Sequence, residues 1–344
     1  MLKRFIYLIL VGMSLIIVVT AHNFETGIVA KPPKNVELTL ASFVVTRNAY
    51  KAIIPKFTQK WYKEHNQIVH INQSYSSSGA QTRAVIDGLP ADIVHLAMAL
   101  DTKKIEQNGL IASGWESRLP NNSIVSKSVV ALVTRKDNPR KINDWPDLAN
   151  HDVQIITAHP KTSGVARWSF LALWNAGMKS EKNEAKITDY IAKVYSNAPI
   201  LSRDARDATE TFLKQGQGDA LINYEHEVIL AQQKGLHLNY VIPDINVSID
   251  NPITIVDKNV DRHGNREVVE AFIQQLFTPE AQAEFAKVGF RPVVDIKGFK
   301  KSIVKYPPVK NLNQVSDFGG WNKVQTKFFA NGAMFDQIQN QINH

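Results

Sequence analysis

The sequence predicts an α/β protein with two lobes and a ligand cleft between them. Strand-like and helix-like segments alternate along most of the 344 residues, as in sheets that are covered by helices. A second α/β unit, roughly residues 130–245, is flanked on both sides by parts of the first, so two crossing strands should join the lobes. Ligands of such folds bind at the domain interface, outside the carboxyl ends of strands.

Apolar alternation identifies the strands, and apolar residues at helical spacing identify the helices. The expected strands are residues 36–42, 68–72, 91–97, 128–134, 153–157, 220–224, 238–242 and 253–256. The expected helices are residues 46–65, 81–87, 102–108, 144–148, 166–175, 185–195, 207–215, 225–234, 265–277 and 279–288, before a long C-terminal tail. This order assigns residues 36–129 and 246–344 to lobe 1 and residues 130–245 to lobe 2.

The N-terminus has the pattern of an export signal. Residues 1–4 include the basic Lys3 and Arg4, residues 5–20 are nearly all apolar, and Ala21 offers a small residue for cleavage. We therefore expect a signal peptide over residues 1–21, a linker over residues 22–35 and a periplasmic location. The apolar run of 16 residues is short for a membrane span, but an uncleaved inner-membrane anchor stays open.

Composition limits the chemistry that this chain can perform. The absence of cysteine excludes disulfides, thiol catalysis, thiolate metal sites and cysteine-linked lipid. The 10 histidines are scattered without a metal-binding spacing, so we expect neither a metal nor another cofactor. The net charge of +8 is not gathered into a dense stripe, which argues against nucleic-acid binding. A positive field can still help to collect anions.

Five loops that turn directly into helices open with small or hydroxyl residues. They cover residues 42–47, 73–81, 161–168, 204–209 and 223–225. A helix start offers free backbone N–H groups and the positive end of the helix dipole, which together form a ready anion site. The chain has no nucleophile elbow, Walker loop or dinucleotide fingerprint, so we expect no enzyme. The loops predict a site for one small oxyanion.

Several long motifs follow one another in order between about Leu38 and Ile338. They cover residues 72–81, 83–94, 118–123, 160–164, 166–168, 318–321 and 335–337. Together they resemble the bacterial periplasmic sulfate- and thiosulfate-binding proteins. The resemblance implies the two-lobed type II periplasmic-binding fold, with a mixed sheet flanked by helices in each lobe. It also implies a protein, which we expect to be a monomer, that delivers sulfate to the membrane subunits of an ABC importer.

The resemblance further implies that sulfate is held, without its water shell, by neutral donors. Such a site suits an ion that only accepts hydrogen bonds. Carried over by position, the donor segments fall on Val44, Ser78, Ser163, Gly164, Val165, Ala205 and Tyr224. Most of these residues would donate a backbone N–H, and the two serines and the tyrosine would add side-chain donors. Behind the loops we expect three arginines that balance charge and fix the helix starts, namely Arg47, Arg167 and Arg206.

The donor set departs from the family pattern, which leaves alternatives open. Val44 replaces an aspartate, Val165 replaces a glycine and Tyr224 replaces a tryptophan. A tyrosine hydroxyl can accept as well as donate. Asp204 and Asp207 bring carboxylates near the site, unless they only cap their helix. Phosphate and molybdate therefore stay open beside sulfate and thiosulfate, and an anchored anion sensor stays open beside a transport component.

Some of these residues also have a plainer interpretation. Ser78 and Ser163 have the residue type of ordinary helix N-caps. Trp168 lies one turn into its helix, where core packing is the simpler role. Tyr224 ends a strand at the expected edge of the cleft, which favours contact with the ligand.

Overall fold

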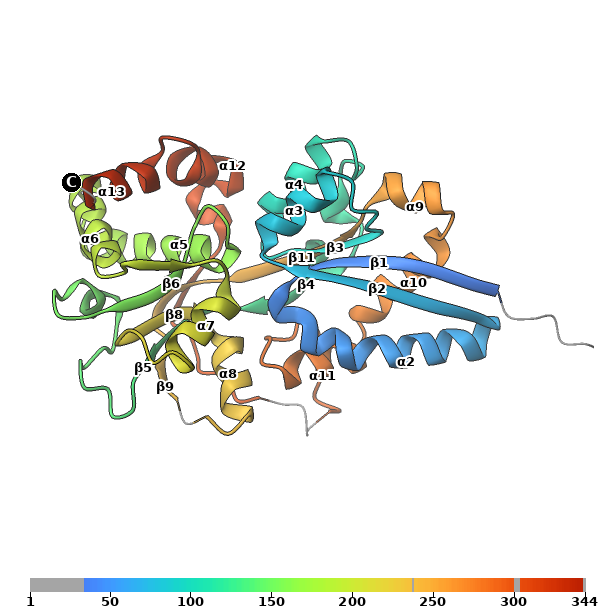
Figure 1. Ribbon diagram of the computed structural model, residues 1–344, viewed down its shortest axis with the longest axis horizontal. Coiled ribbons are helices and arrows are strands. Elements are labelled where there is room, and N and C mark those ends of the chain that lie inside the picture. Colours follow the sequence, from blue (N-terminus) through green and yellow to red (C-terminus); the bar gives the residue numbers. More distant parts are fainter. Residues whose placement is uncertain (1–33, 237, 300–303, 343–344) are drawn as a thin grey trace, which may run out of the picture. The chain divides into compact units, whose positions relative to one another are not determined.

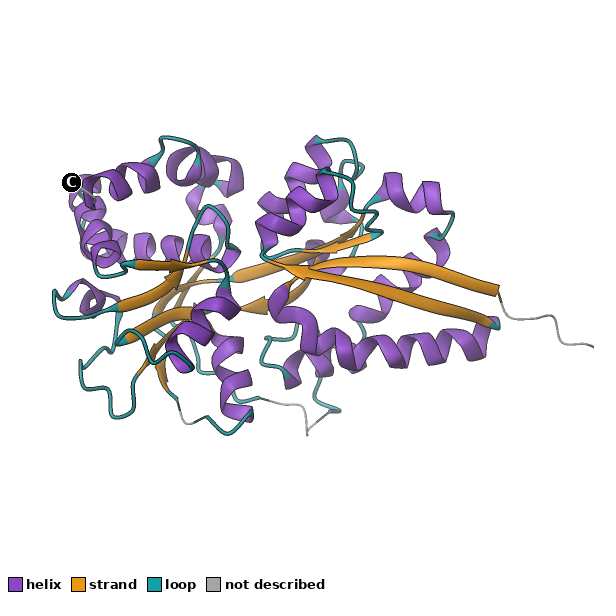
Figure 2. Cartoon of the chain, in the orientation of Figure 1, coloured by secondary structure: helices purple, strands orange, loops and turns teal. Residues whose placement is uncertain are grey.

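The structure is a computed structural model that describes residues 34–236, 238–299 and 304–342. The predicted signal peptide and most of the predicted linker lie outside the described residues. Two sheets, each covered by helices, make up the described part (Figures 1 and 2). Within that part, none of the helices combines the length and the apolar character needed to cross a membrane.

The first sheet has five strands in the order β2-β1-β3-β11-β4. The first and third strands of the chain run parallel, and β11 runs antiparallel to both of its neighbours. The strands are β1 (Lys34–Phe43), β2 (Gln67–Ser76), β3 (Ile93–His95), β4 (Ile124–Ser128) and β11 (Ile249–Ile255). The surrounding helices are α2 (Arg47–His65), α3 (Ser78–Ile86), α4 (Ala99–Gln107), α9 (Asp257–His263), α10 (Arg266–Leu276) and α11 (Pro279–Lys287).

The second sheet also has five strands, in the order β7-β6-β8-β5-β9. In it, β6 runs parallel to β7 and β8, and β5 runs antiparallel to β8 and β9. The strands are β5 (Val130–Thr134), β6 (Ile155–Ala158), β7 (Ile200–Ser202), β8 (Ala220–Tyr224) and β9 (Asn239–Val241). The helices on this side are α5 (Gly164–Ser180), α6 (Glu184–Ser196), α7 (Ala205–Leu213), α8 (Glu225–Gln233), α12 (Gly320–Val324) and α13 (Met334–Ile342).

The chain passes between the two sheets where β4 leads into β5, and it returns where β10 (Ile245–Val247) leads into β11. A parallel pair of β10 with β12 (Asn311–Asn313) lies beside this return crossing. Short helical turns complete the framework: η1 (Val44–Thr46), η2 (Trp115–Ser117), η3 (Pro120–Ser123), η4 (Trp145–Ala149), η6 (Val315–Phe318) and the π-helical η7 (Gln325–Phe329). The predicted two-lobed α/β fold class is confirmed.

The C-terminal segment corrects the prediction of a long tail. It folds into α12, η7 and α13, and α13 packs along α6. Aromatic residues of this segment meet α5, since Phe328 and Phe335 lie 5.4 and 6.3 Å from Phe170 between ring centroids. Sequence analysis grouped these residues with lobe 1, whereas these contacts are with helices of the second sheet. Glycines with positive φ separate its short helices and hide the helical period.

Candidate functional site

A small cavity lies where loops from both sheets meet. Its volume is about 10 Å³, roughly the room for one water molecule, so the loops from the two sheets lie close together here. The first sheet contributes Phe43, Val44, Val45, Ser76, Ser77, Ser78 and Ala97, and the second contributes Ser163, Gly164, Asp204, Ala205 and Tyr224. Six of the seven predicted ligand-binding residues therefore line one cavity. A larger groove of about 610 Å³ beside Trp174 contains none of them.

Four helical segments begin at this cavity. Their first residues are Val44 in η1, Ser78 in α3, Gly164 in α5 and Ala205 in α7. The first N–H groups of a helix have no partner inside the helix, and the positive end of the dipole lies there. The cavity is thus surrounded by backbone donors. Val165 is second in α5, and its side chain is 1% exposed and belongs to the core, so only its N–H is available.

The start of α7 is fixed by its own N-cap. Asp204 accepts from the N–H groups of Arg206 and Asp207, both at 3.0 Å. The Asp207 carboxylate in turn accepts from the Arg203 N–H at 2.9 Å. Both acids therefore serve the helix turn, as the simpler interpretation of the sequence predicts. The Ala205 N–H is the first-turn donor that this cap leaves for the cavity.

The start of α5 leaves a hydroxyl without a hydrogen bond to any described residue. Ser163 is the N-cap residue, but its side chain forms no capping hydrogen bond, and its own N–H donates to the His159 carbonyl at 2.9 Å. Arg167 holds this loop from behind by donating its Nε–H to the Pro160 carbonyl at 2.7 Å. Ser163 therefore lines the cavity, and its hydroxyl has no hydrogen-bond partner among the described residues, unlike that of an ordinary N-cap.

Ser78 is held in a different way. Its hydroxyl accepts from the Ala97 N–H at 3.0 Å and donates to Asp101 Oδ2 at 2.7 Å. A hydroxyl has one proton to donate, so toward the cavity Ser78 offers its backbone N–H rather than its side chain. Ser77, and not Ser78, is the N-cap residue of α3.

The carboxylate that Ser78 contacts lies near two cationic side chains. Asp101 is 2% exposed, and its Oδ1 has no hydrogen-bond partner among the described residues. Arg167 of α5 and Lys104 of α4 place their nitrogens 3.8 and 3.7 Å from that oxygen. Because Asp101 lies beside the first sheet and Arg167 beside the second, this ion pair links the lobes. Burial lowers the pKa of Arg167, and the Asp101 charge opposes that shift.

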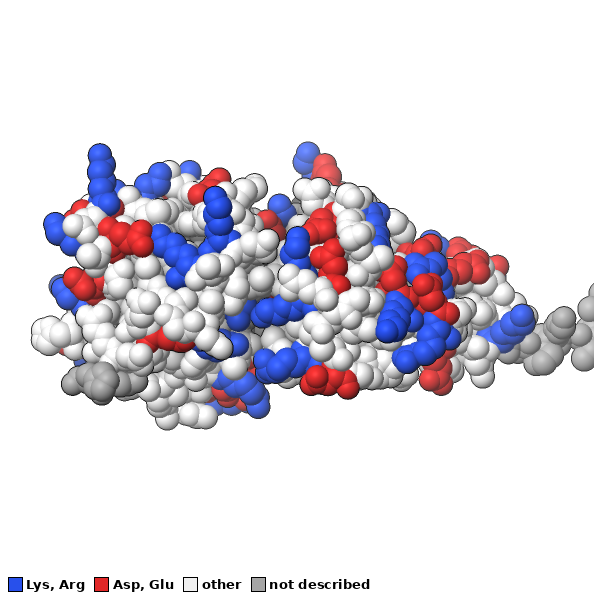
Figure 3. Space-filling model, turned by 90° about the horizontal axis from the view of Figure 1, so that it is seen from above, with Lys and Arg blue, Asp and Glu red and all other residues white. Residues whose placement is uncertain are grey.

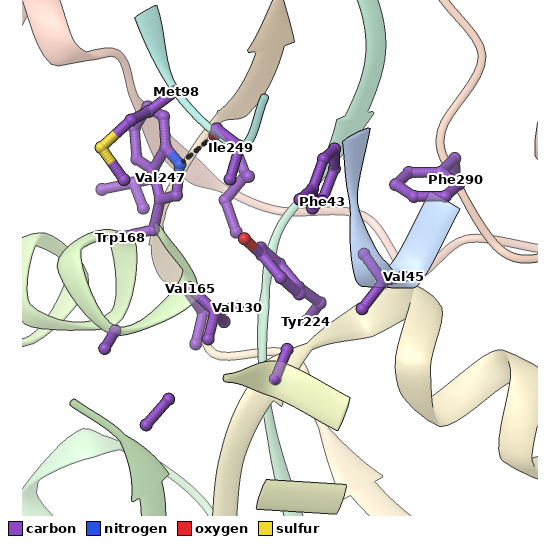
Figure 4. Packing of buried hydrophobic residues seen from close by; sticks show 14 of the residues in the cluster. Phe43, Val45, Met98, Val130, Val165, Trp168, Tyr224, Val247, Ile249 and Phe290 are labelled. Carbon is purple, nitrogen blue, oxygen red and sulfur yellow. Dashed lines mark hydrogen bonds between the residues drawn. The ribbon is translucent and has the colours of Figure 1, made fainter. Parts of the chain in front are cut away.

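Tyr224 supplies the second free hydroxyl. Its ring stacks on His226 at 4.7 Å, and His226 stacks on Phe290 of the other lobe at 4.0 Å between centroids. Figure 4 shows the Tyr224 ring between Phe43 and Val165. Burial raises the pKa of Tyr224 well above 10, and the charges of Asp101, Glu227 and Asp204 add to the shift. The hydroxyl therefore keeps its proton and remains a donor.

The other two predicted arginines contact neighbouring side chains outside the cavity lining. Arg206 donates to Glu227 Oε1 at 2.8 Å, and burial raises the pKa of Glu227 although Arg206 opposes the shift. Arg47 lies over the Tyr75 ring, 4.7 Å from its centroid. Neither Arg47, Arg167 nor Arg206 lines the cavity.

Among the described residues that line the cavity, Asp204 alone has a charged side chain. None of the described residues that line it is a lysine or an arginine. Nor do the described parts of the chain contain a group of three or more His, Asp or Glu that could hold a metal ion. On the face in Figure 3, scattered basic and acidic side chains lie among a larger uncharged surface. The donors at the cavity are therefore the N–H groups of the helix starts and the hydroxyls of Ser163 and Tyr224.

Sequence analysis did not single out several residues of the site. Phe43 and Val45 flank a predicted residue, and Ser76 and Ser77 belong to a serine-rich loop that was recognised as a whole. Ala97 could have been found, since it follows the carboxyl end of a parallel strand, where ligands bind in such folds. Asp101 carries no local signal, because it has the appearance of an ordinary first-turn acid.

Comparisons with known proteins agree with this geometry. Residues 38–291 match the family model for "Bacterial extracellular solute-binding protein". A sulfate-binding protein of Synechocystis is 52% identical over 89% of this chain and 87% of its own length. A thiosulfate-binding protein of Pseudomonas aeruginosa is 34% identical over 86% of this chain and 90% of its own. The solved structure of a sulfate-binding protein from Mycobacterium tuberculosis is 30% identical, with a TM-score of 0.76 and coverage of 86% and 100%.

Proposed function

Because this chain belongs to the bacterial extracellular solute-binding proteins, within their sulfate- and thiosulfate-binding family, we propose that it captures sulfate or thiosulfate for an ABC importer. The family is one of binding proteins and not of enzymes. The observation that carries the proposal is the cavity itself, where four helical segments start around two free hydroxyls without a cationic side chain in the wall.

The donor set fits an ion that accepts hydrogen bonds and donates none. The N–H groups of Val44, Ser78, Gly164 and Ala205 and the hydroxyls of Ser163 and Tyr224 form the proposed ligand set, with the Val165 N–H beside them. A fully ionised sulfate carries only acceptor oxygens, so every donor in this set can be matched by an oxygen. Hydrogen bonds to an ion are stronger than neutral ones, and the low dielectric of a closed cavity strengthens them further.

The remaining parts of the proposal follow from the family and from the N-terminus. An export signal with a basic start and an apolar core supports a periplasmic location. We further propose that the closed protein acts as a monomer and docks on the membrane subunits of the importer. The boundaries at residues 129/130 and 245/246 stay our proposal for the two lobes, with the C-terminal helices packed on the second.

One observation favours a second candidate, a protonated oxyanion such as phosphate. Asp204 lines the cavity, and a carboxylate oxygen can accept the proton that phosphate still carries near neutral pH. Against this, the two first-turn N–H groups of α7 already occupy Asp204 Oδ1. The cap role of Asp204 therefore favours sulfate or thiosulfate.

Calorimetry on the mature protein tests the proposal. The protein is unfolded, freed of ligand and refolded, and is then titrated with sulfate, thiosulfate, phosphate and molybdate at pH 6 and pH 8, below and above the second pKa of phosphate at about 6–7. We expect tight binding of sulfate or thiosulfate with little dependence on pH, because neither the ligand nor its donors titrate in this range.

Two results would contradict the proposal. Preference for phosphate with pH-dependent affinity would show that Asp204 contacts the ligand, and the variant Asp204→Asn would then lose that preference. A protein that binds none of the four anions would show that the cavity has a different ligand. Near-ultraviolet circular dichroism before titration is the control for correct refolding.

A further inference from the structure

The Ala97 peptide joins three parts of the binding site. Its N–H donates to the Ser78 hydroxyl at 3.0 Å, and its carbonyl accepts from Asn251 Nδ2 at 3.0 Å. The carbonyl also accepts from the Trp168 indole N–H at 2.9 Å, the hydrogen bond drawn in Figure 4. Asn251 belongs to β11, in the same sheet as the strand β3 that leads to Ala97, whereas Trp168 belongs to α5 on the other sheet. Only the Trp168 bond therefore depends on the lobes being together.

The packing around Trp168 holds its indole in the orientation of this hydrogen bond. It is 1% exposed, and its ring meets the Trp321 ring edge to face at a centroid distance of 4.7 Å. Trp321 belongs to α12 in the C-terminal segment and to the sequence motif at residues 318–321, which contributes nothing to the proposed ligand set. Its role here is to pack against the Trp168 ring. A buried indole N–H without a partner would be costly. Breaking the hydrogen bond between the Trp168 indole and the Ala97 carbonyl therefore costs free energy, unless water reaches the indole N–H.

The close approach of α5 to Ala97 also explains Gly164. A Cβ atom at Gly164 would lie 2.4 Å from the Ala97 Cβ, which no side-chain rotation could relieve. The glycine thus lets the helix start and the Ala97 peptide meet at the distance that the indole bond requires.

We infer that Trp168 is a positioning residue for ligand capture, whose indole N–H holds the two lobes closed over the cavity through the Ala97 carbonyl. It does not line the cavity, and it acts by fixing the peptide that orients Ser78. The inference rests on the proposed function, since it concerns how the same cavity retains its anion. An interaction present only in the closed state slows ligand release and leaves the encounter rate nearly unchanged.

The test compares two conservative variants on the same helix. Trp168→Phe keeps an aromatic ring against Trp321 and removes the donor to Ala97. Trp174→Phe is the matched control, because Trp174 is also buried in α5 but packs on Phe328, away from the cavity. Since the chain has no cysteine, exposed Gln107 in α4 and Lys193 in α6 can be replaced by cysteine and labelled without background.

Fluorescence transfer between these labels reports closing on sulfate and on thiosulfate, and release is followed by stopped flow with excess unlabelled protein as a trap. We expect Trp168→Phe to release the anion roughly three- to tenfold faster, the change that one hydrogen bond produces, with an association rate within about twofold of wild type. Trp174→Phe should release it at the wild-type rate.

The outcomes separate this inference from the proposed function. Equal release rates in the two variants, or a change confined to association, overturn the positioning role while wild-type binding keeps the proposed function standing. A wild-type protein that neither binds nor closes with sulfate or thiosulfate overturns both.

Discussion

At the scale of single residues, Ser163 makes the most direct side-chain contribution to the cavity. Its hydroxyl lines the cavity and does not cap α5, so a bound anion is the partner that the structure leaves for it. We predict that Ser163→Ala weakens anion binding by about 1.5–3 kcal/mol, the value for a hydrogen bond to a charged group. Calorimetry with the preferred anion measures the loss.

The control is Ser196→Ala, the same change at an exposed serine whose hydroxyl donates to the Lys193 carbonyl. It should bind as wild type does. Unaltered affinity in Ser163→Ala would remove this hydroxyl from the ligand set and leave the site to backbone donors and Tyr224.

At the scale of elements, the N-cap of α7 separates the structural role of Asp204 from a ligand role. Its carboxylate holds two first-turn N–H groups. We predict that Asp204→Ala lowers the free energy of unfolding by about 1 kcal/mol, the usual cost of a lost N-cap, whereas Asp204→Asn, an equally good cap, changes it little. Urea unfolding measures both.

Anion affinity is the second property to measure in the two Asp204 variants. Asp204→Asn removes a negative charge from the cavity wall, so sulfate should bind at least as tightly as to the wild type. Weaker sulfate binding in Asp204→Asn, at unchanged stability, would contradict a role restricted to capping.

The element scale also shows what the sequence could predict. The strand at residues 220–224 was placed correctly, because a buried β-rich run has clear ends. The starts of α3, α5 and α7 were predicted two or three residues too late, since serine, glycine and alanine in the first turn carry no apolar period. The motifs, rather than the periodicity, therefore located Ser78 and Gly164, and the family resemblance located Ala205 by position.

Long-range contacts lay beyond sequence reasoning. Nothing local in the sequence pairs Asp101 with Ser78, a contact made by the packing of α4 on α3, or Trp168 with Ala97, a contact between the lobes. The helix α9 and the short strands β7, β10 and β12 were missed for a related reason, as segments of three to seven residues take their structure from their neighbours.

At the scale of the whole molecule, a buried ion pair joins the lobes behind the cavity. Arg291 donates to both oxygens of Glu225, at 2.7 and 2.9 Å, and Glu225 is fully buried. Burial raises the pKa of Glu225, and the hydrogen bond and charge of Arg291 oppose the shift. We predict that Arg291→Met lowers the free energy of unfolding by about 3–5 kcal/mol, because it leaves a buried carboxylate unpaired.

Two further variants make this prediction specific. The double variant Glu225→Gln/Arg291→Met should recover much of the loss, since no buried charge remains. Lys310→Met is the control, because its pair with Asp244 is exposed and should be worth about 0–1 kcal/mol. A loss below about 1 kcal/mol for Arg291→Met in urea unfolding would contradict the argument.

The pH dependence of stability is the second property of the whole molecule. His95 is fully buried beside the Tyr50 hydroxyl, which lies 2.7 Å from its Nδ1, and burial lowers the pKa of His95 from 6.5 to about 3. In the unfolded chain the pKa returns to about 6.5. Between these values the unfolded state binds the additional proton. The contribution of His95 to stability is therefore complete above pH 6.5 and is lost as the pH falls toward 3.

The prediction concerns the difference in the free energy of unfolding between wild type and His95→Gln. Burial raises the pKa values of Glu225 and Glu227, which changes stability with pH in the opposite direction, but this effect is the same in both proteins and cancels in the difference. From pH 7 to pH 5 the stability of the wild type relative to the variant should fall by about 2 kcal/mol, given about 1.4 kcal/mol per pH unit below the unfolded pKa. Urea unfolding at several pH values measures it. His151→Gln, at an exposed histidine, should run parallel to the wild type. Parallel curves for His95→Gln as well would show that His95 takes up its proton in the folded protein.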